Sequence, residues 1–160
     1  MMLMLPQAVL GQMADHLTAC LPEEGCGLLG GQGQTAVQCV AVENALHSPV
    51  RFRMQAMEQF SAMMRFDAAG LELLAIFHSH PRGPGNPSAT DVAEFYYPGV
   101  LVLICAPYGL GAARRGVLRV GNWQITGYQI EPEGVLAVKL EILGHDPPVR
   151  SKDPQFLPEA

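Results

Sequence analysis

Hydrophobic residues recur along this chain with two different periods. Apolar side chains repeat at helical spacing over residues 10–21, which predicts an amphipathic helix that opens near Pro6 and ends before Pro22. The same spacing over residues 57–68 predicts a second amphipathic helix, which ends near Gly70. Each of these helices therefore has one apolar face to bury.

Strands are predicted where short apolar runs are bounded by glycine, proline and polar turn residues. These runs cover Gly25–Gly30, Thr35–Val42, Val50–Met54, Leu71–His80, Val100–Ala106, Gly116–Val120, Asn122–Ile130 and Val135–Ile142. The third run is expected as a short strand or as an extended entry to the second helix. A short helix is expected from Ser88 to Tyr96, because Pro98 and Gly99 stop it there. The mixture of helices and strands predicts an α/β (α+β) protein.

Length and composition indicate one folded domain followed by a tail. The chain has 160 residues, of which 49% are hydrophobic and 16% charged, and this is enough to bury a proper core. Four prolines in a polar setting follow Gly144, so we expect a domain over residues 1–143 and a loose tail over residues 144–160. We expect no signal peptide and no segment that crosses a membrane.

Charge and cysteine usage limit the classes of function. The net charge of −5 gives no electrostatic support for nucleic-acid binding. The four cysteines lack C-x-x-C spacing and stand in apolar contexts, so they are expected as reduced core residues of a cytoplasmic protein. A cysteine nucleophile is a weaker alternative, because none of the four has a histidine nearby in a suitable pattern.

The polar residues at the end of one predicted strand are typical of a metal site. His78 and His80 lie two residues apart, so both imidazoles share one face of an extended chain and can reach one point. Ser88 is placed to cap the next helix, and Asp91 would face back from its first turn. Two neutral nitrogens, one carboxylate oxygen and one open position are the ligand set of catalytic zinc. The alternative is a polar strand end followed by a capped helix.

A further carboxylate directly precedes another predicted strand. Glu24 directly precedes the apolar run that begins at Gly25, and metal-assisted hydrolysis needs a general base beside the activated water. Its neighbour Glu23 is expected to be solvated. Glu24 is therefore our candidate for the general base.

Three motifs together resemble the JAMM (MPN+) family of zinc metalloproteases. They are Glu24-Gly25-Cys26-Gly27, His78-x-His80-Pro81 and Ser88-x-x-Asp91, which match E-x-C-G followed by H-x-H-P-x6-S-x-x-D without a gap. Asn44 stands where the family usually has an asparagine. The resemblance implies a curved mixed sheet flanked by helices in a deaminase-like architecture, with one Zn2+ per chain.

The same resemblance implies a role for each site residue. His78, His80 and Asp91 would bind zinc, Glu24 would act as the base, and Ser88 would donate to the oxyanion of the tetrahedral intermediate. Stand-alone prokaryotic members of this kind act after the C-terminal tail of a small ubiquitin-like or sulfur-carrier protein. We therefore expect such a protein as the substrate, cleaved at a peptide or an isopeptide bond.

Other functions and several details stay open at this point. The chain could be a general zinc peptidase on unstructured peptides, or a metal-free scaffold of the same fold that only binds proteins. A zinc deaminase is disfavoured because its H-x-E and P-C-x-x-C motifs do not occur. The oligomeric state is open, and so is whether Asn44 or His47 lines the cleft.

Overall fold

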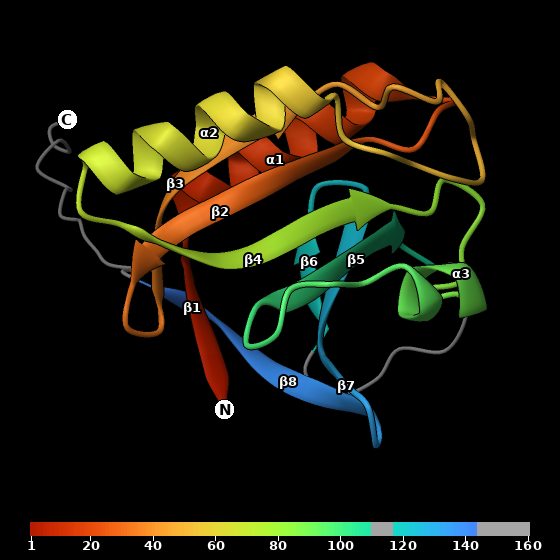
Figure 1. The fold of residues 1–160 in the computed structure, drawn as a ribbon. Helices are drawn as coiled ribbons and strands as arrows, with labels where there is room; N and C mark the ends of the chain where they lie inside the picture. Colours follow the sequence, from red (N-terminus) through yellow and green to blue (C-terminus); the bar gives the residue numbers. More distant parts are fainter. Residues whose placement is uncertain (110–116, 144–160) are drawn as a thin grey trace, which may run out of the picture.

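The computed structural model describes residues 1–109 and 117–143, which form three helices and eight strands (Figure 1). In chain order the elements are β1 (Met2–Pro6), α1 (Gln7–Cys20), β2 (Cys26–Gln32), β3 (Thr35–Val42), α2 (Ala56–Ala68), β4 (Glu72–Ser79), α3 (Ala89–Ala93), β5 (Leu101–Pro107), β6 (Leu118–Val120), β7 (Trp123–Glu131) and β8 (Gly134–Leu143). No helix within these residues is long and apolar enough to cross a membrane.

All eight strands belong to one strongly curved sheet. Their order is β5-β4-β2-β3-β1-β8-β7-β6, and β5 also pairs with β7, so the sheet closes on itself. The pairs β1–β3, β1–β8 and β4–β5 are parallel, and the other pairs are antiparallel. The predicted α/β fold with a curved mixed sheet and flanking helices is therefore confirmed.

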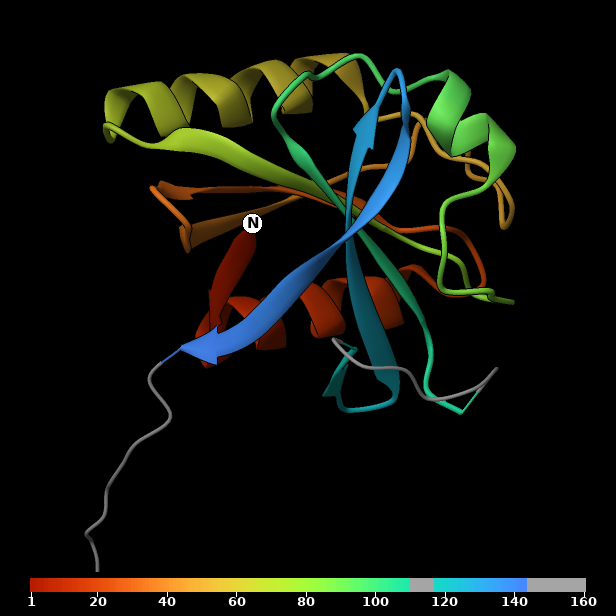
Figure 2. The same cartoon turned by 90° about the horizontal axis from the view of Figure 1, so that it is seen from below.

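The two long helices cover opposite faces of the strands β2, β3 and β4 (Figure 2). Neighbouring residues of β2 point to opposite sides: Leu29 joins the hydrophobic cluster that contains Leu17 of α1, whereas Leu28 joins the cluster that contains Phe66 of α2. A strand buried on both faces reads as a continuous apolar run, which is the pattern found in the sequence.

The first strand is absent from our prediction. We expected the N-terminal segment to lead directly into a helix near Pro6, but Met2–Pro6 forms β1 and the helix begins at Gln7. This strand pairs in parallel with β8, from Met2 opposite Lys139 to Pro6 opposite Leu143. A pairing partner that lies far away in sequence leaves no local signal, so periodicity alone does not reveal it.

Two other predicted elements are shorter than expected. Val50–Met54 forms no strand, which leaves the alternative of an entry segment to α2, and its only bridge joins Met54 to Asn44. The helix expected from Ser88 to Tyr96 spans only Ala89–Ala93. The predicted tail over residues 144–160, together with residues 110–116, lies outside the described residues.

All four cysteines are free, as the sequence analysis expected. Burial raises the pKa of the Cys26 and Cys39 thiols to about 12, and burial also raises the pKa of Cys20 and Cys105. A thiol that stays protonated is a poor nucleophile, so a cysteine-based mechanism is disfavoured.

The close packing of β2 gives a direct test of the fold. A Cβ atom at Gly27 would lie 2.4 Å from the Phe77 ring and 2.7 Å from the Val40 carbonyl oxygen. Gly27→Ala should therefore lower the free energy of unfolding by about 1–3 kcal/mol, as overpacking of a core does. The measurement is chemical denaturation followed by circular dichroism.

Gly11 in α1 provides the matched control. A Cβ atom there meets no atom within 4 Å, so Gly11→Ala should stabilise the helix by about 1 kcal/mol. Equal effects of the two substitutions would contradict the packing described for β2.

Candidate metal centre

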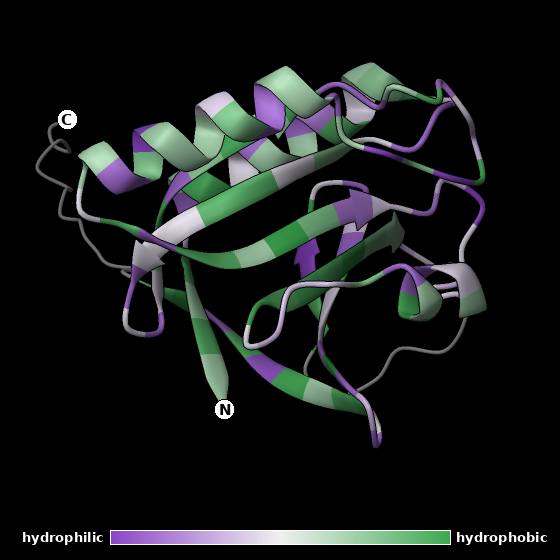
Figure 3. Ribbon diagram, in the orientation of Figure 1, coloured by the Kyte–Doolittle hydropathy of each residue, from purple (hydrophilic) through white to green (hydrophobic). Residues whose placement is uncertain are grey.

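The site lies at the C-terminal end of β4, where the strand changes from hydrophobic to hydrophilic (Figure 3). His78 is the second-last residue of β4, and His80 follows the strand directly. The backbone N–H of His80 donates to the carbonyl oxygen of Cys105 at 2.8 Å, which extends the ladder to β5 by one further bond. Both rings are therefore held by strand geometry, and their Nε2 atoms lie 3.2 Å apart.

The carboxylate of Asp91 completes a group of three donor atoms. Its Oδ2 atom lies 3.2 Å from Nε2 of His78 and 3.0 Å from Nε2 of His80. Asp91 reaches this position from the first turn of α3, where it forms a capping box with Ser88. The structure thus brings together the three residues that the sequence analysis proposed as metal ligands.

The three atoms fit a tetrahedral ion. They form a nearly equilateral triangle with sides of 3.0–3.2 Å. Bonds of 2.0–2.1 Å to a tetrahedral zinc ion separate the donor atoms by about 3.3 Å. A carboxylate oxygen of Glu24 lies close by, since it and the ring nitrogens of both histidines are within 4.8 Å of one another. The donor set and its spacing can therefore hold one metal ion.

The far side of the His80 ring fixes which nitrogen carries the proton. Nδ1 lies 2.8 Å from the carbonyl oxygen of Pro84, which can only accept, so Nδ1 must donate and a neutral ring keeps its Nε2 lone pair for a metal. The next carbonyl in this loop, that of Gly85, accepts from the hydroxyl of Tyr128 at 2.9 Å. The loop after β4 thereby orients a ligand as well as connecting two elements.

His78 is held by packing. Its ring stacks on Phe52, with centroids 4.2 Å apart, and its side chain is 2% exposed. Burial lowers the pKa of His78, which favours the neutral ring that a metal needs.

The other two members of the triangle, His80 and Asp91, shift each other's pKa. Burial lowers the pKa of His80, but hydrogen bonds to Asp91 and Pro84 outweigh burial and the pKa is raised. Burial alone would raise the pKa of Asp91, but the two histidines hold this pKa well below its usual range. Asp91 is therefore an anion at neutral pH, as a metal ligand must be.

The register between β2 and β4 places Glu24. Cys26 pairs with His78 across the two antiparallel strands. Continuing this register by two residues puts Glu24 opposite His80, on the same face of the sheet. Glu24 is 4% exposed, and burial raises the pKa of its carboxyl group to about 7. A carboxyl group with this pKa can both accept and release a proton near neutral pH.

Ser88 can both cap α3 and donate to an oxyanion. Its Oγ atom accepts from the backbone N–H of Asp91 at 3.0 Å, which caps α3. An oxygen that accepts a hydrogen bond still carries its own hydrogen, so the hydroxyl remains able to donate. Ser88 also lines the cavity beside the metal site, where such a donor would be needed.

A cavity of about 440 Å³ opens beside the donor atoms. Its lining includes His78, Ser88 and Asp91, together with apolar side chains such as Phe52 and Ile76. It is bounded by the segment that precedes α2 and by the segment around α3. An ion pair of 3.1 Å between Arg51 and Glu94 joins these two segments.

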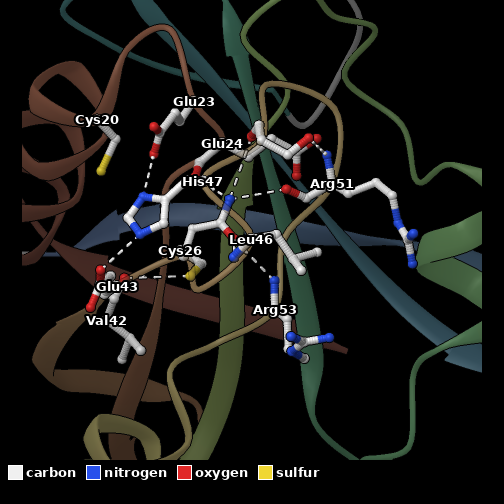
Figure 4. A network of polar contacts seen from close by, with 12 residues as sticks. Cys20, Glu23, Glu24, Cys26, Val42, Glu43, Leu46, His47, Arg51 and Arg53 are labelled. Atoms are coloured by element: carbon white, nitrogen blue, oxygen red, sulfur yellow. Dashed lines mark hydrogen bonds and ion pairs between the residues drawn. The ribbon is translucent and has the colours of Figure 1, made fainter.

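Neither of the two residues left open by the sequence analysis lines this cavity. His47 is exposed and lies between Glu23, at 3.2 Å, and Glu43, at 3.0 Å (Figure 4). Glu23 is thus a surface partner of His47. Asn44 is 5% exposed and makes hydrogen bonds to the surrounding backbone.

Sequence reasoning missed Phe52 and Tyr128 as parts of the site. Phe52 falls in the segment expected as a short strand or an extended entry, and its stacking on His78 is a tertiary contact. The contact of Tyr128 with the Gly85 carbonyl oxygen depends on the pairing of β5 with β7.

Comparison with known proteins places the chain in a family. Residues 6–117 match the family described as prokaryotic homologs of the JAB domain. A Thermus thermophilus protein named as a probable TtuB-protein conjugate cleaving protease is 33% identical over 59% of this chain and 64% of its own length. A desampylase of Haloferax volcanii is 34% identical over 55% of this chain and 66% of its own length.

The matched regions and a solved structure agree with this assignment. The chain spans slightly less than two thirds of the length of either curated relative. A solution structure of a Desulfitobacterium hafniense protein superposes with a TM-score of 0.72 at 28% identity, covering 89% of this chain and 92% of that one. The family match runs from the last residue of β1 through β5, and this part of the chain carries the three proposed metal ligands together with Glu24 and Ser88. The chain belongs to the family of prokaryotic homologs of the JAB domain.

Proposed function

We propose that this protein is a zinc-dependent peptidase or isopeptidase that hydrolyses the amide bond after the C-terminal tail of a ubiquitin-like or sulfur-carrier protein. The observation that carries the proposal is the triangle of His78, His80 and Asp91 donor atoms beside the buried Glu24 carboxylate. Metal ligands alone would fit a structural site, but a nearby carboxyl group with a pKa of about 7 supports hydrolysis.

His78, His80 and Asp91 would hold the metal. Two imidazole nitrogens and one carboxylate oxygen leave a fourth position open, which is typical of catalytic zinc. When bound, zinc supplies a Lewis acid that makes hydroxide available near neutral pH, because it lowers the pKa of water from about 15.7 to about 7.

Glu24 would move the proton during hydrolysis. Its carboxylate accepts a proton from the attacking water while the water oxygen bonds to the carbonyl carbon. The same carboxyl group then gives that proton to the leaving amine as the C–N bond breaks. Burial keeps its pKa near the working pH, so one group can perform both transfers.

Ser88 would stabilise the charge that develops on the substrate. Its oxygen is held by the Asp91 N–H at 3.0 Å, so the hydroxyl hydrogen is free to donate to the carbonyl oxygen of the substrate. Because α3 fixes the serine before substrate arrives, no reorganisation is needed during the reaction.

The substrate class is supported by the relatives. One is named for cleaving protein conjugates of TtuB, and the other is named a desampylase. The resemblance to stand-alone prokaryotic JAMM members points in the same direction. An extended tail with small residues would also enter beside the sheet more readily than folded protein, since its main chain can hydrogen-bond there. The four free thiols are compatible with a cytoplasmic location.

Metal binding should depend on the histidine pair. The purified protein should hold about one zinc per chain, and His80→Ala should lose it while the circular dichroism spectrum stays unchanged. His47→Ala is the control, because this histidine is exposed and lies outside the triangle. Full zinc occupancy of the His80→Ala protein, measured by elemental analysis, would contradict the assignment.

Catalysis should be separable from metal binding. Glu24→Gln should keep zinc but lose about 10²–10⁴-fold in kcat, because an amide cannot accept the proton. Near-normal turnover by zinc-loaded Glu24→Gln protein would exclude Glu24 as the base.

Ser88→Ala should also keep zinc and lose about 10²–10³-fold in kcat, as expected for an oxyanion donor. A change in melting temperature alone would leave Ser88 as a helix cap.

The substrate is tested with carrier proteins. Small ubiquitin-like and sulfur-carrier proteins, extended beyond a C-terminal Gly-Gly, should be trimmed after the Gly-Gly, and mass spectrometry of the products should show it. Zinc-loaded Glu24→Gln protein is the control. Equal cleavage of unrelated unstructured peptides would make the protein a general peptidase, and binding of carriers without any cleavage would make it a scaffold.

A further inference from the structure

The carboxylate of Glu24 has little to orient it directly. Its Oε1 atom is buried and has no hydrogen-bond partner among the described residues. A side chain without such a partner takes its direction from its own backbone and from packing. The position of the proposed base therefore depends on what holds the peptide groups of residues 24 and 25.

On one side, a buried asparagine holds this backbone. The Nδ2 atom of Asn44 donates to the carbonyl oxygens of Glu24 at 3.0 Å and of Arg51 at 2.9 Å. Its Oδ1 atom accepts from the backbone N–H groups of Leu46 at 3.0 Å and of Arg53 at 3.1 Å. Figure 4 shows Glu24, Leu46, Arg51 and Arg53 around this network of hydrogen bonds. One amide thus ties Glu24 to the segment that borders the cavity.

Another bond attaches the same residue to this segment. The backbone N–H of Glu24 donates to the carbonyl oxygen of Ser48 at 2.9 Å. Both backbone polar groups of Glu24 are therefore bound within the turn that starts at Asn44. Because the peptide can neither rotate nor shift without breaking a buried bond, the turn fixes where the side chain begins.

On the other side, the residue between the two histidines holds Gly25. Ser79 is fully buried, and its Oγ atom accepts from the Gly25 N–H at 2.8 Å. Its own N–H donates to the Gly25 carbonyl oxygen at 2.9 Å. The side-chain bond is additional to the ladder between β2 and β4. Ser79 thus connects the residue that follows the proposed base with the end of β4, where the two histidines lie.

We propose that Asn44 and Ser79 are positioning residues that set the Glu24 carboxylate relative to the metal site. The proposal rests on the proposed function of Glu24 as the base. Neither residue lines the cavity, so neither contacts substrate there. A misplacement of about 1 Å can cost about 10²-fold in rate. Loss of either tether therefore lowers kcat through Glu24 and leaves zinc and substrate binding in place.

A double-mutant cycle on zinc-loaded protein tests this coupling. Asn44→Ala and Ser79→Ala are made in the wild type and in Glu24→Gln protein, and kcat and KM are measured with an extended carrier well below the melting temperature of each variant. In the wild type, each substitution should lower kcat about tenfold or more with little change in KM. In Glu24→Gln protein, each should have less than about a twofold effect, because the group being positioned is already inactive.

Thr18→Ala is the matched control. The Thr18 hydroxyl accepts from the buried Trp123 indole at 2.9 Å, so this variant also loses a hydrogen bond, but Thr18 does not line the cavity. It should lower the melting temperature and leave kcat unchanged.

Amide hydrogen exchange provides a readout that does not depend on turnover. Exchange at Gly25 should accelerate in Ser79→Ala, and exchange at Leu46 and Arg53 should accelerate in Asn44→Ala. Unchanged exchange would contradict the tethers. If either substitution lowers kcat by the same factor in Glu24→Gln protein as in the wild type, a role through Glu24 is contradicted. Absence of turnover by the zinc-loaded wild type would instead contradict the proposed function.

Discussion

The antiparallel register between β2 and β4 is the constraint on which the site depends. It pairs Cys26 with His78 and so brings Glu24 across from His80. A slip of one residue would turn every side chain of a strand to the other face of the sheet, and the base would leave the metal donors. In β2, Gly27 fits closely against Phe77 and Gly31 fits closely against the Thr35 carbonyl oxygen. These close contacts disfavour other arrangements of β2 against its neighbouring strands.

The polar side chains of the site are buried, which costs free energy. The contacts that offset this cost differ from one side chain to the next. Asp91 accepts a hydrogen bond from the Ser88 backbone N–H, and the two histidines beside it hold its pKa well below the usual range, so it remains charged. His80 donates to Pro84, whereas His78 relies on stacking against Phe52 and leaves Nδ1 without a partner among the described residues. Three lone-pair donors at 3.0–3.2 Å from one another form an arrangement that a cation stabilises.

Local spacing was enough to predict that the side chains of His78, His80 and Asp91 would lie together. The two-residue period of a strand put His78 and His80 on one face, and capping rules put Asp91 in the first turn of a helix. What failed were features that depend on distant pairing or on packing. The strand β1 exists through its contacts with β8, and the run from Val50 to Met54 covers the site as an irregular segment. Phe52 and Tyr128 entered the site through tertiary contacts that no local pattern encodes.

The metal donors and the base are held by different means, and the difference follows from what each must do. A ligand must keep a fixed direction, so the His80 ring is locked by a hydrogen bond at its far nitrogen and Asp91 by its capping box. A base must gain and lose a proton, and strong bonds to its carboxylate would hold its pKa low. The structure leaves Oε1 of Glu24 without a hydrogen bond and anchors the peptide behind it through Asn44 and Ser79. Anchoring the backbone fixes the position of the base without adding a hydrogen bond to its charge, and burial raises its pKa to about 7.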